Sequence, residues 1–200
     1  EPLSGWYVDG EDTVTEQQLK WMSDFGIDYV VYDWYWGQKI AYLEHALASY
    51  FRASNNDLVN FSILWANHDN GPKTLDDFTS MVSYWSSYYF KHSQYQRIDG
   101  KPVVFVFSAA NLEVTANKFG KSTKELFSLA NMIAISKGFD GIYFVGGAGA
   151  YDSAFMNESP VNGYSAFSAY NYHTGRSSLV SQPVPYSHSF VELDKGYQYH

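Results

Sequence analysis

Five short apolar runs alternate with helix-forming segments along the chain, and this alternation limits the folds that the sequence can adopt. The runs are residues 27–32, 59–65, 102–107, 141–145 and 164–170. They are nearly continuously apolar, which is typical of strands buried on both faces of a parallel sheet. The first four start roughly 30 to 45 residues apart, which leaves room for a helix between successive parallel strands. The sequence therefore predicts an α/β fold with about five parallel strands, in one domain over residues 1–200.

The segments between these runs carry helix signals. Three of them open with a hydroxyl residue followed three positions later by an acid, which is a pattern of helix starts: Thr13 and Glu16, Thr74 and Asp77, Ser122 and Glu125. A fourth helix is expected over residues 38–53, where Ile40, Leu43, Leu47 and Tyr50 recur at helical spacing. Residues 108–113 are expected to form a polar loop after the third strand.

Charge and hydropathy exclude several classes of partner. The formal net charge is −8 and the isoelectric point is near 5.1, without a cluster of Lys or Arg, so we expect no nucleic-acid partner. No window approaches the apolar length of a membrane span, and we expect a soluble protein without a membrane partner. The chain has no cysteine, which leaves the compartment open, with an extracytoplasmic one favoured.

Aromatic residues make up 19% of the chain, with 18 Tyr, 14 Phe and 6 Trp. One interpretation is an aromatic core. The other is a carbohydrate site, because flat rings pack against the C–H faces of sugars while nearby polar groups bond the hydroxyls. Composition alone does not choose between them.

Polar and aromatic side chains gather where the predicted strands end, which is where parallel α/β folds place their ligands. They are Asp33, Trp34, Tyr35 and Trp36 after the first strand; Trp65, Asn67, His68 and Asp69 after the second; Asn111 after the third; glycines within 146–149 after the fourth; and Tyr172 and His173 after the fifth. We therefore expect a binding site at this edge of the sheet.

Each of these features has a structural alternative. Asp33 can cap a loop, and Trp34 and Trp36 can close the end of the core. Asn67, His68 and Asp69 are hydrogen-bonding side chains in succession, which favours a site. Neighbours in sequence seldom point at one ion, so we expect no metal, and we expect no cofactor. The glycines at 146–149 lack the order of a nucleotide-binding loop, which leaves phosphate binding a weaker alternative.

Four segments, in the same order, carry a resemblance to a known family: "GIDYVVYDWYW", "FSILWANHDN", "YFKHSQYQRIDGKPVVFVFS" and "SAFSAYNYH". Together they resemble glycoside hydrolase family 99-like domains, including the WbsX-like domains of polysaccharide gene clusters. The resemblance covers essentially the whole chain. It implies a (β/α)8 barrel and a carbohydrate-active function, since characterised members are endo-acting, retaining α-mannosidases. It also implies that Asp33, Trp34, Trp36, Asn67 and His68 line a glycan cleft, with Tyr172 and His173 farther along.

The chain departs from the family in one respect. The resemblance places the two catalytic carboxylates in a late Glu-Trp-x-Glu motif, which does not occur in these 200 residues. We therefore expect a partial barrel with the equivalents of strands two to six. Such a chain is expected to be a fragment of a longer enzyme or a homo-oligomer that covers its open sheet edges.

The candidate site is accordingly assigned as follows. Asp33 and Asp69 are the candidate catalytic carboxylates, and the candidate substrate-binding residues are Trp34, Tyr35, Trp36, Trp65, Asn67, His68, Asn111, Tyr172 and His173. The expected partner is an oligosaccharide or polysaccharide. The alternative is a non-catalytic glycan-binding or self-assembling protein derived from a barrel fragment.

Overall fold

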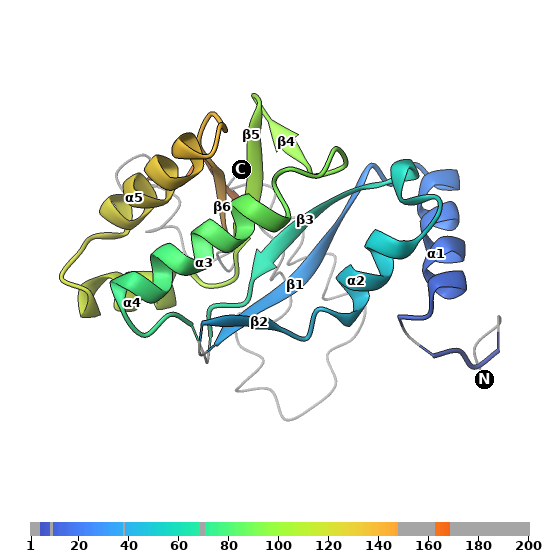
Figure 1. Ribbon diagram of the computed structural model, residues 1–200, viewed down its shortest axis with the longest axis horizontal. Helices are drawn as coiled ribbons and strands as arrows, with labels where there is room; N and C mark the ends of the chain where they lie inside the picture. Colours follow the sequence, from blue (N-terminus) through green and yellow to red (C-terminus); the bar gives the residue numbers. More distant parts are fainter. Residues whose placement is uncertain (1–4, 9, 38, 69–70, 148–162, 169–200) are drawn as a thin grey trace, which may run out of the picture.

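A parallel sheet forms the centre of the protein (Figure 1). The computed structural model describes residues 5–8, 10–37, 39–68, 71–147 and 163–168. The sheet order within them is β2-β1-β3-β5-β6-β7, with β4 paired to β5. The parallel strands are β1 (Tyr29–Gly37), β3 (Asn60–Trp65), β5 (Lys101–Val106), β6 (Tyr143–Gly147) and β7 (Ala166–Ser168). The prediction of five parallel strands is confirmed, and over the described ranges β1 and β7 do not pair, so the sheet is not closed.

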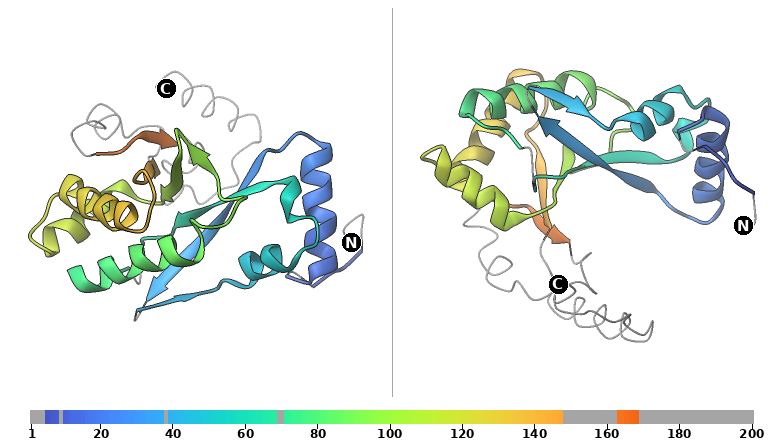
Figure 2. Two further views of the ribbon diagram at one scale, coloured as in Figure 1. Left: turned by 45° about the horizontal axis from the view of Figure 1, so that its top comes forward. Right: turned by 90° about the horizontal axis from the view of Figure 1, so that it is seen from below.

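Helices cover one face of this sheet (Figures 1 and 2). They are α2 (His45–Arg52), α3 (Leu75–Tyr88), α4 (Ala109–Lys118) and α5 (Thr123–Ser136). The first helix, α1 (Asp12–Asp24), packs against α2 and the short 3-10 helix η1 (Asn56–Leu58) beside the amino-terminal end of β1. In the part of the chain that the structure describes, no helix is long and apolar enough to cross a membrane.

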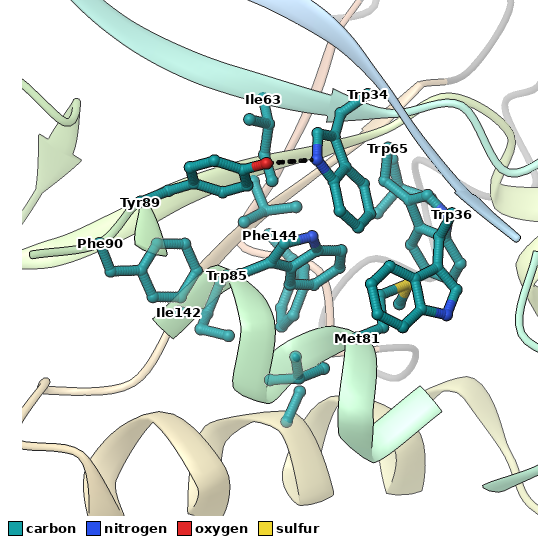
Figure 3. Packing of buried hydrophobic residues seen from close by; sticks show 14 of the residues in the cluster. Trp34, Trp36, Ile63, Trp65, Met81, Trp85, Tyr89, Phe90, Ile142 and Phe144 are labelled. Atoms are coloured by element: carbon teal, nitrogen blue, oxygen red, sulfur yellow. Dashed lines mark hydrogen bonds between the residues drawn. The ribbon is translucent and has the colours of Figure 1, made fainter. Parts of the chain in front are cut away.

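The core is the aromatic layer between the sheet and these helices (Figure 3). The ring of Trp34 lies edge-on to Trp85 of α3 with centroids 5.5 Å apart, and it stacks on Trp36 at 5.7 Å. Farther along the sheet, Phe127 of α5 stacks on Phe144 of β6 at 4.0 Å. Much of the aromatic content is therefore core, which was the first of the two interpretations of the composition.

Two short antiparallel strands were not predicted. They are β2 (Ile40–Tyr42), which pairs with the end of β1, and β4 (Arg97–Ile98), which pairs with the start of β5. The predicted helix over residues 38–53 is wrong in its first half, because Lys39 and Leu43 have φ values of 63° and 58°, outside the right-handed helical region. The backbone of β2 finds its hydrogen-bond partners on β1, and the helix begins only at His45.

The predicted helix starts agree with the structure in two of three cases. The Thr74 hydroxyl accepts from the Asp77 backbone N–H, and Ser122 forms a complete capping box with Glu125. The third predicted helix is also present as α1, but it begins at Asp12, so Thr13 lies within its first turn and is not the cap. The expected loop after β5 is also wrong, because residues 109–118 form α4 and the Ser108 hydroxyl accepts from the Asn111 N–H.

We predict that Ser122→Ala lowers the free energy of unfolding by about 1 kcal/mol, because the backbone N–H of Glu125 loses its acceptor. Urea unfolding of the purified chain measures this change. Thr13→Ala is the matched control, since its hydroxyl caps no helix and alanine favours the helix interior, so its stability should be unchanged or slightly higher. Equal losses in the two variants would contradict the capping assignment.

Candidate functional site

The alternation of side chains along β1 divides the Asp33-Trp34-Tyr35-Trp36 segment between two faces of the sheet. Trp34 and Trp36 face the helices and are 1% and 3% exposed, whereas Asp33 is exposed and Tyr35 half-buried on the opposite face. The prediction that Trp34 and Trp36 stack on a sugar does not fit this burial. Successive residues of a strand point to opposite faces, and the segment belongs to β1 itself instead of a following loop.

Three aromatic side chains meet at the carboxyl ends of β1, β3 and β5, on the face away from the helices. The ring of His68 lies edge-on to Tyr35 at a centroid distance of 6.0 Å and packs against Phe107 at 5.1 Å. Asp33, two residues before Tyr35, shares its face of β1. We call Asp33, Tyr35, His68 and Phe107 the strand-end cluster.

Within the cluster, the surroundings shift the pKa of Tyr35. Burial, followed by the negative charge of Asp33, raises the pKa of the Tyr35 phenol above its ordinary value. The phenol therefore keeps its proton at neutral pH and remains able to donate a hydrogen bond beside a carboxylate that can only accept one. A donor and an acceptor next to flat rings are the groups that a sugar hydroxyl and a sugar C–H face require.

Asn67 holds two of the strand ends together. Its side-chain N–H donates to the Ser108 carbonyl at 2.8 Å, and its side-chain oxygen accepts from the Ser108 N–H at 2.8 Å. The residue is 7% exposed. The structure thus gives Asn67, which was predicted to bind substrate, a positioning function that fixes His68 relative to the start of α4.

A pocket of about 180 Å³ opens beside the cluster, between the segment that follows β3 and one side of α4. Four of its lining residues were predicted as site residues, namely Trp65, Asn67, His68 and Asn111. Lys73 and Lys118 also line it and were missed by the sequence analysis. We call this the lysine pocket.

Trp65 contributes a buried polar group to the lysine pocket. The residue is 1% exposed, and its indole Nε1–H has no hydrogen-bond acceptor in the part of the chain that the structure describes. A buried donor without an acceptor costs about 1–3 kcal/mol, so this group calls for an explanation. Because its ring is buried and lies against Phe78 and Trp85, Trp65 does not offer an exposed platform for stacking, contrary to expectation.

A second pocket, of about 260 Å³, lies beside β1 and the start of α2 and is lined by Asp33, Tyr35 and Glu44 among others. The sequence analysis missed Glu44. Its carboxylate accepts hydrogen bonds from the hydroxyls of Tyr89 and, at 3.4 Å, Tyr84. Burial, followed by the bond to Glu44, raises the pKa of Tyr89 far above its ordinary value. Glu44 therefore links the start of α2 to the end of α3 through these hydrogen bonds.

Several predicted site residues lie outside the described residues, so the expectations for them remain predictions: Asp69, Tyr172 and His173. Of the glycines at 146–149, Gly146 and Gly147 pair with β7 inside strand β6, which does not suit a phosphate-binding loop. Over the described ranges, no three His, Asp or Glu side chains come together as metal ligands.

Comparison with known proteins places the chain in a family and a fold. A family model described as "Glycosyltransferase WbsX" matches residues 2–190. No protein with a curated description matches the chain. Two solved structures of a GH99 endo-alpha-mannosidase from Bacteroides thetaiotaomicron, one in complex with BIS-TRIS-propane, match 88% of the chain with 15% identity and TM-scores of 0.58 and 0.59. A "glycoside hydrolase-like protein" matches 74% of the chain with 16% identity and a TM-score of 0.54.

The chain spans about half the length of these solved structures, which it covers to 48%, 51% and 46% respectively. At this level of identity the likeness shows the fold, and it agrees with a barrel-type α/β sheet that is partial within the described residues. The resemblance first seen in four sequence segments is thus confirmed.

We predict that Trp34→Ala lowers the free energy of unfolding by about 3–5 kcal/mol, because it leaves a cavity in the core and removes the donor bonded to Tyr89. Chemical denaturation measures the loss. Trp21→Ala is the matched control, since the Trp21 side chain is 45% exposed on α1 and its removal should change stability much less. A Trp34 variant as stable as the Trp21 variant would contradict the assignment of Trp34 to the core.

Proposed function

Because the chain belongs to the family described as Glycosyltransferase WbsX, we propose that it binds or acts on an oligosaccharide or polysaccharide at the carboxyl ends of β1, β3 and β5. The observation that carries the proposal is the strand-end cluster, where His68 contacts the rings of Tyr35 and Phe107, and Asp33 supplies a carboxylate on the same face of β1 as Tyr35. The family description names a transferase and the similar structures are named as hydrolases and mannosidases. Both classes act on the bond at the anomeric carbon of a sugar.

The cluster suits a pyranose ring in a specific way. Tyr35, His68 and Phe107 offer ring edges and faces against which sugar C–H groups pack. Asp33 accepts hydrogen bonds from sugar hydroxyls, and hydrogen bonds to a charged group are stronger than those between neutral groups. The protonated Tyr35 phenol supplies a donor at the same place.

Catalysis by this chain would need two carboxylates. In retaining enzymes one of them attacks the anomeric carbon, while the other protonates the oxygen of the leaving sugar. The glycosyl group of this ester is then transferred to water or to a sugar hydroxyl, which releases the first carboxylate, while the second, now deprotonated, removes the proton of the incoming group. We assign the first carboxylate to Asp33 and the second to Asp69, which follows His68 directly in the sequence. The names of the similar structures make an α-mannoside the first substrate to test.

A non-catalytic function is the second candidate. The late Glu-Trp-x-Glu motif is absent from these 200 residues, and this favours glycan binding without cleavage by the chain itself. Over the described residues, the first part of β1 pairs with β3 alone, and Ile27 and Tyr29 beside this edge are 46% and 40% exposed, which supports self-assembly as part of this candidate. Turnover by the wild-type chain separates the two candidates.

We predict that Asp33→Asn lowers the turnover of an α-mannan oligosaccharide by about 100-fold or more if Asp33 is catalytic, because the amide can neither attack nor exchange a proton. If the chain only binds, calorimetry should show about a tenfold loss of affinity, since the amide replaces a charged acceptor. Asp69→Asn is expected to behave in the same way.

Asp28→Asn is the control for both measurements, because Asp28 is an exposed carboxylate just before the opposite end of β1. Activity and affinity should be unchanged in this variant. If Asp33→Asn were also without effect on turnover and on affinity, the strand-end cluster would not be the site.

A further inference from the structure

The lysine pocket brings two cationic side chains together in a protein whose net charge is −8. Lys73 precedes α3 and Lys118 ends α4, and both are exposed. Within the described part of the chain, neither ammonium group has an ion-pair or hydrogen-bond partner. Over the described residues no carboxylate forms an ion pair with either lysine, so both positive charges can act on a ligand in this pocket.

Trp65 supplies the second, independent observation. Its Nε1–H is buried and finds no acceptor among the described residues, and an indole nitrogen can only donate. The ring carbon Cζ2, on the same edge of the indole as the N–H group, faces Gly71, where an added Cβ would lie 3.9 Å away. Because Gly71 has no side chain, it places no atoms in the space beside that edge. A donor without an acceptor, an open space and two cations are what an anionic oxygen requires.

The size and position of the pocket suit a single substituent of a sugar better than a whole sugar chain. Its volume of about 180 Å³ is below the range of roughly 300–1,000 Å³ that is usual for sites of drug-sized ligands. His68 lines the pocket, and its ring also contacts Tyr35 and Phe107 of the strand-end cluster. A sugar on the cluster can therefore extend a charged group past His68 into the pocket.

We propose that the lysine pocket binds an anionic group, a carboxylate or a phosphate, carried by the glycan that occupies the strand-end cluster. Lys73 and Lys118 supply the positive charge, Trp65 donates its indole N–H, and the Asn111 side chain lies at the pocket wall as a further donor. This inference rests on the proposed glycan-binding function and names the substrate class of that site as acidic glycans. Neutral glycans bind through the cluster alone and more weakly.

The test follows the Trp65 indole N–H by nitrogen-15 NMR, with its resonance assigned from its loss in Trp65→Phe. Three oligosaccharides of equal length are titrated into the 200-residue chain: a neutral mannose oligosaccharide, a phosphorylated mannose oligosaccharide and an oligogalacturonate. We expect at least one charged ligand to shift this resonance downfield and to bind about tenfold more tightly than the neutral one, with the stronger of the two identifying the natural group.

The expected preference depends on three residues. Lys73→Gln combined with Lys118→Gln should abolish it, and Gly71→Ala should weaken it, because the new methyl group fills the space beside the indole edge at an ordinary contact distance. Lys91→Gln combined with Lys124→Gln is the matched control, since it removes the same charge from exposed positions outside the pocket and should leave the preference intact.

The outcomes separate this inference from the function on which it rests. If neutral and charged glycans bound equally well and the Trp65 resonance did not shift, the anion pocket would be overturned and glycan binding would stand. A preference for the charged ligand that survives the double lysine substitution would also overturn it. If none of the three glycans bound, both the pocket and the proposed function would fail.

Discussion

Burial of the Trp34 and Trp36 rings against α3 fixes the direction in which all the remaining side chains of β1 point. The two indole nitrogens donate to the Tyr89 hydroxyl and the Asp77 carboxylate, each at 2.8 Å. A shift of β1 by one residue would break both buried hydrogen bonds and move two large rings to the other face. Since neighbouring residues alternate, this arrangement leaves Asp33 and Tyr35 on the opposite face, where the Tyr35 ring meets His68. The strand-end cluster therefore depends on core packing that it does not touch.

Backbone pairing carries this constraint to the next two strands. Trp34 pairs with Trp65, and Trp65 pairs with Val106, so β1, β3 and β5 reach the same level at their carboxyl ends. The Asn67 amide then links the segment after β3 to Ser108 through two hydrogen bonds. His68 and Phe107 are thus brought together by strand register and one side-chain clamp.

The sequence predicted the parts of the fold that depend on local chemistry. Continuous apolar runs identified the five parallel strands, and the capping patterns at Thr74 and Ser122 identified two helix starts correctly. It also located the carboxyl ends of the parallel strands, because each can be read from the end of an apolar run. The helix α4 had a comparable signal in Ser108, Asn111 and the apolar Leu112 and Ala116, and this signal was overlooked.

What the sequence could not supply depends on contacts between distant residues. From the sequence alone, the four residues of the Asp33-Trp34-Tyr35-Trp36 segment look equally suited to a site. The structure shows that β1 continues through Gly37, so Trp34 and Trp36 point into the core, and Asp33 and Tyr35 point to the cluster. Lys73 and Lys118 are 45 positions apart and have no common pattern, so only the packing of α4 beside the segment after β3 brings them together. The same packing places His68 between the cluster and the lysine pocket, where one histidine ring borders both a surface suited to sugar C–H groups and a pocket suited to an anion. A ligand that uses both must carry its charge on the side of the sugar that faces α4, and this geometric requirement would distinguish substrates that are otherwise alike in composition.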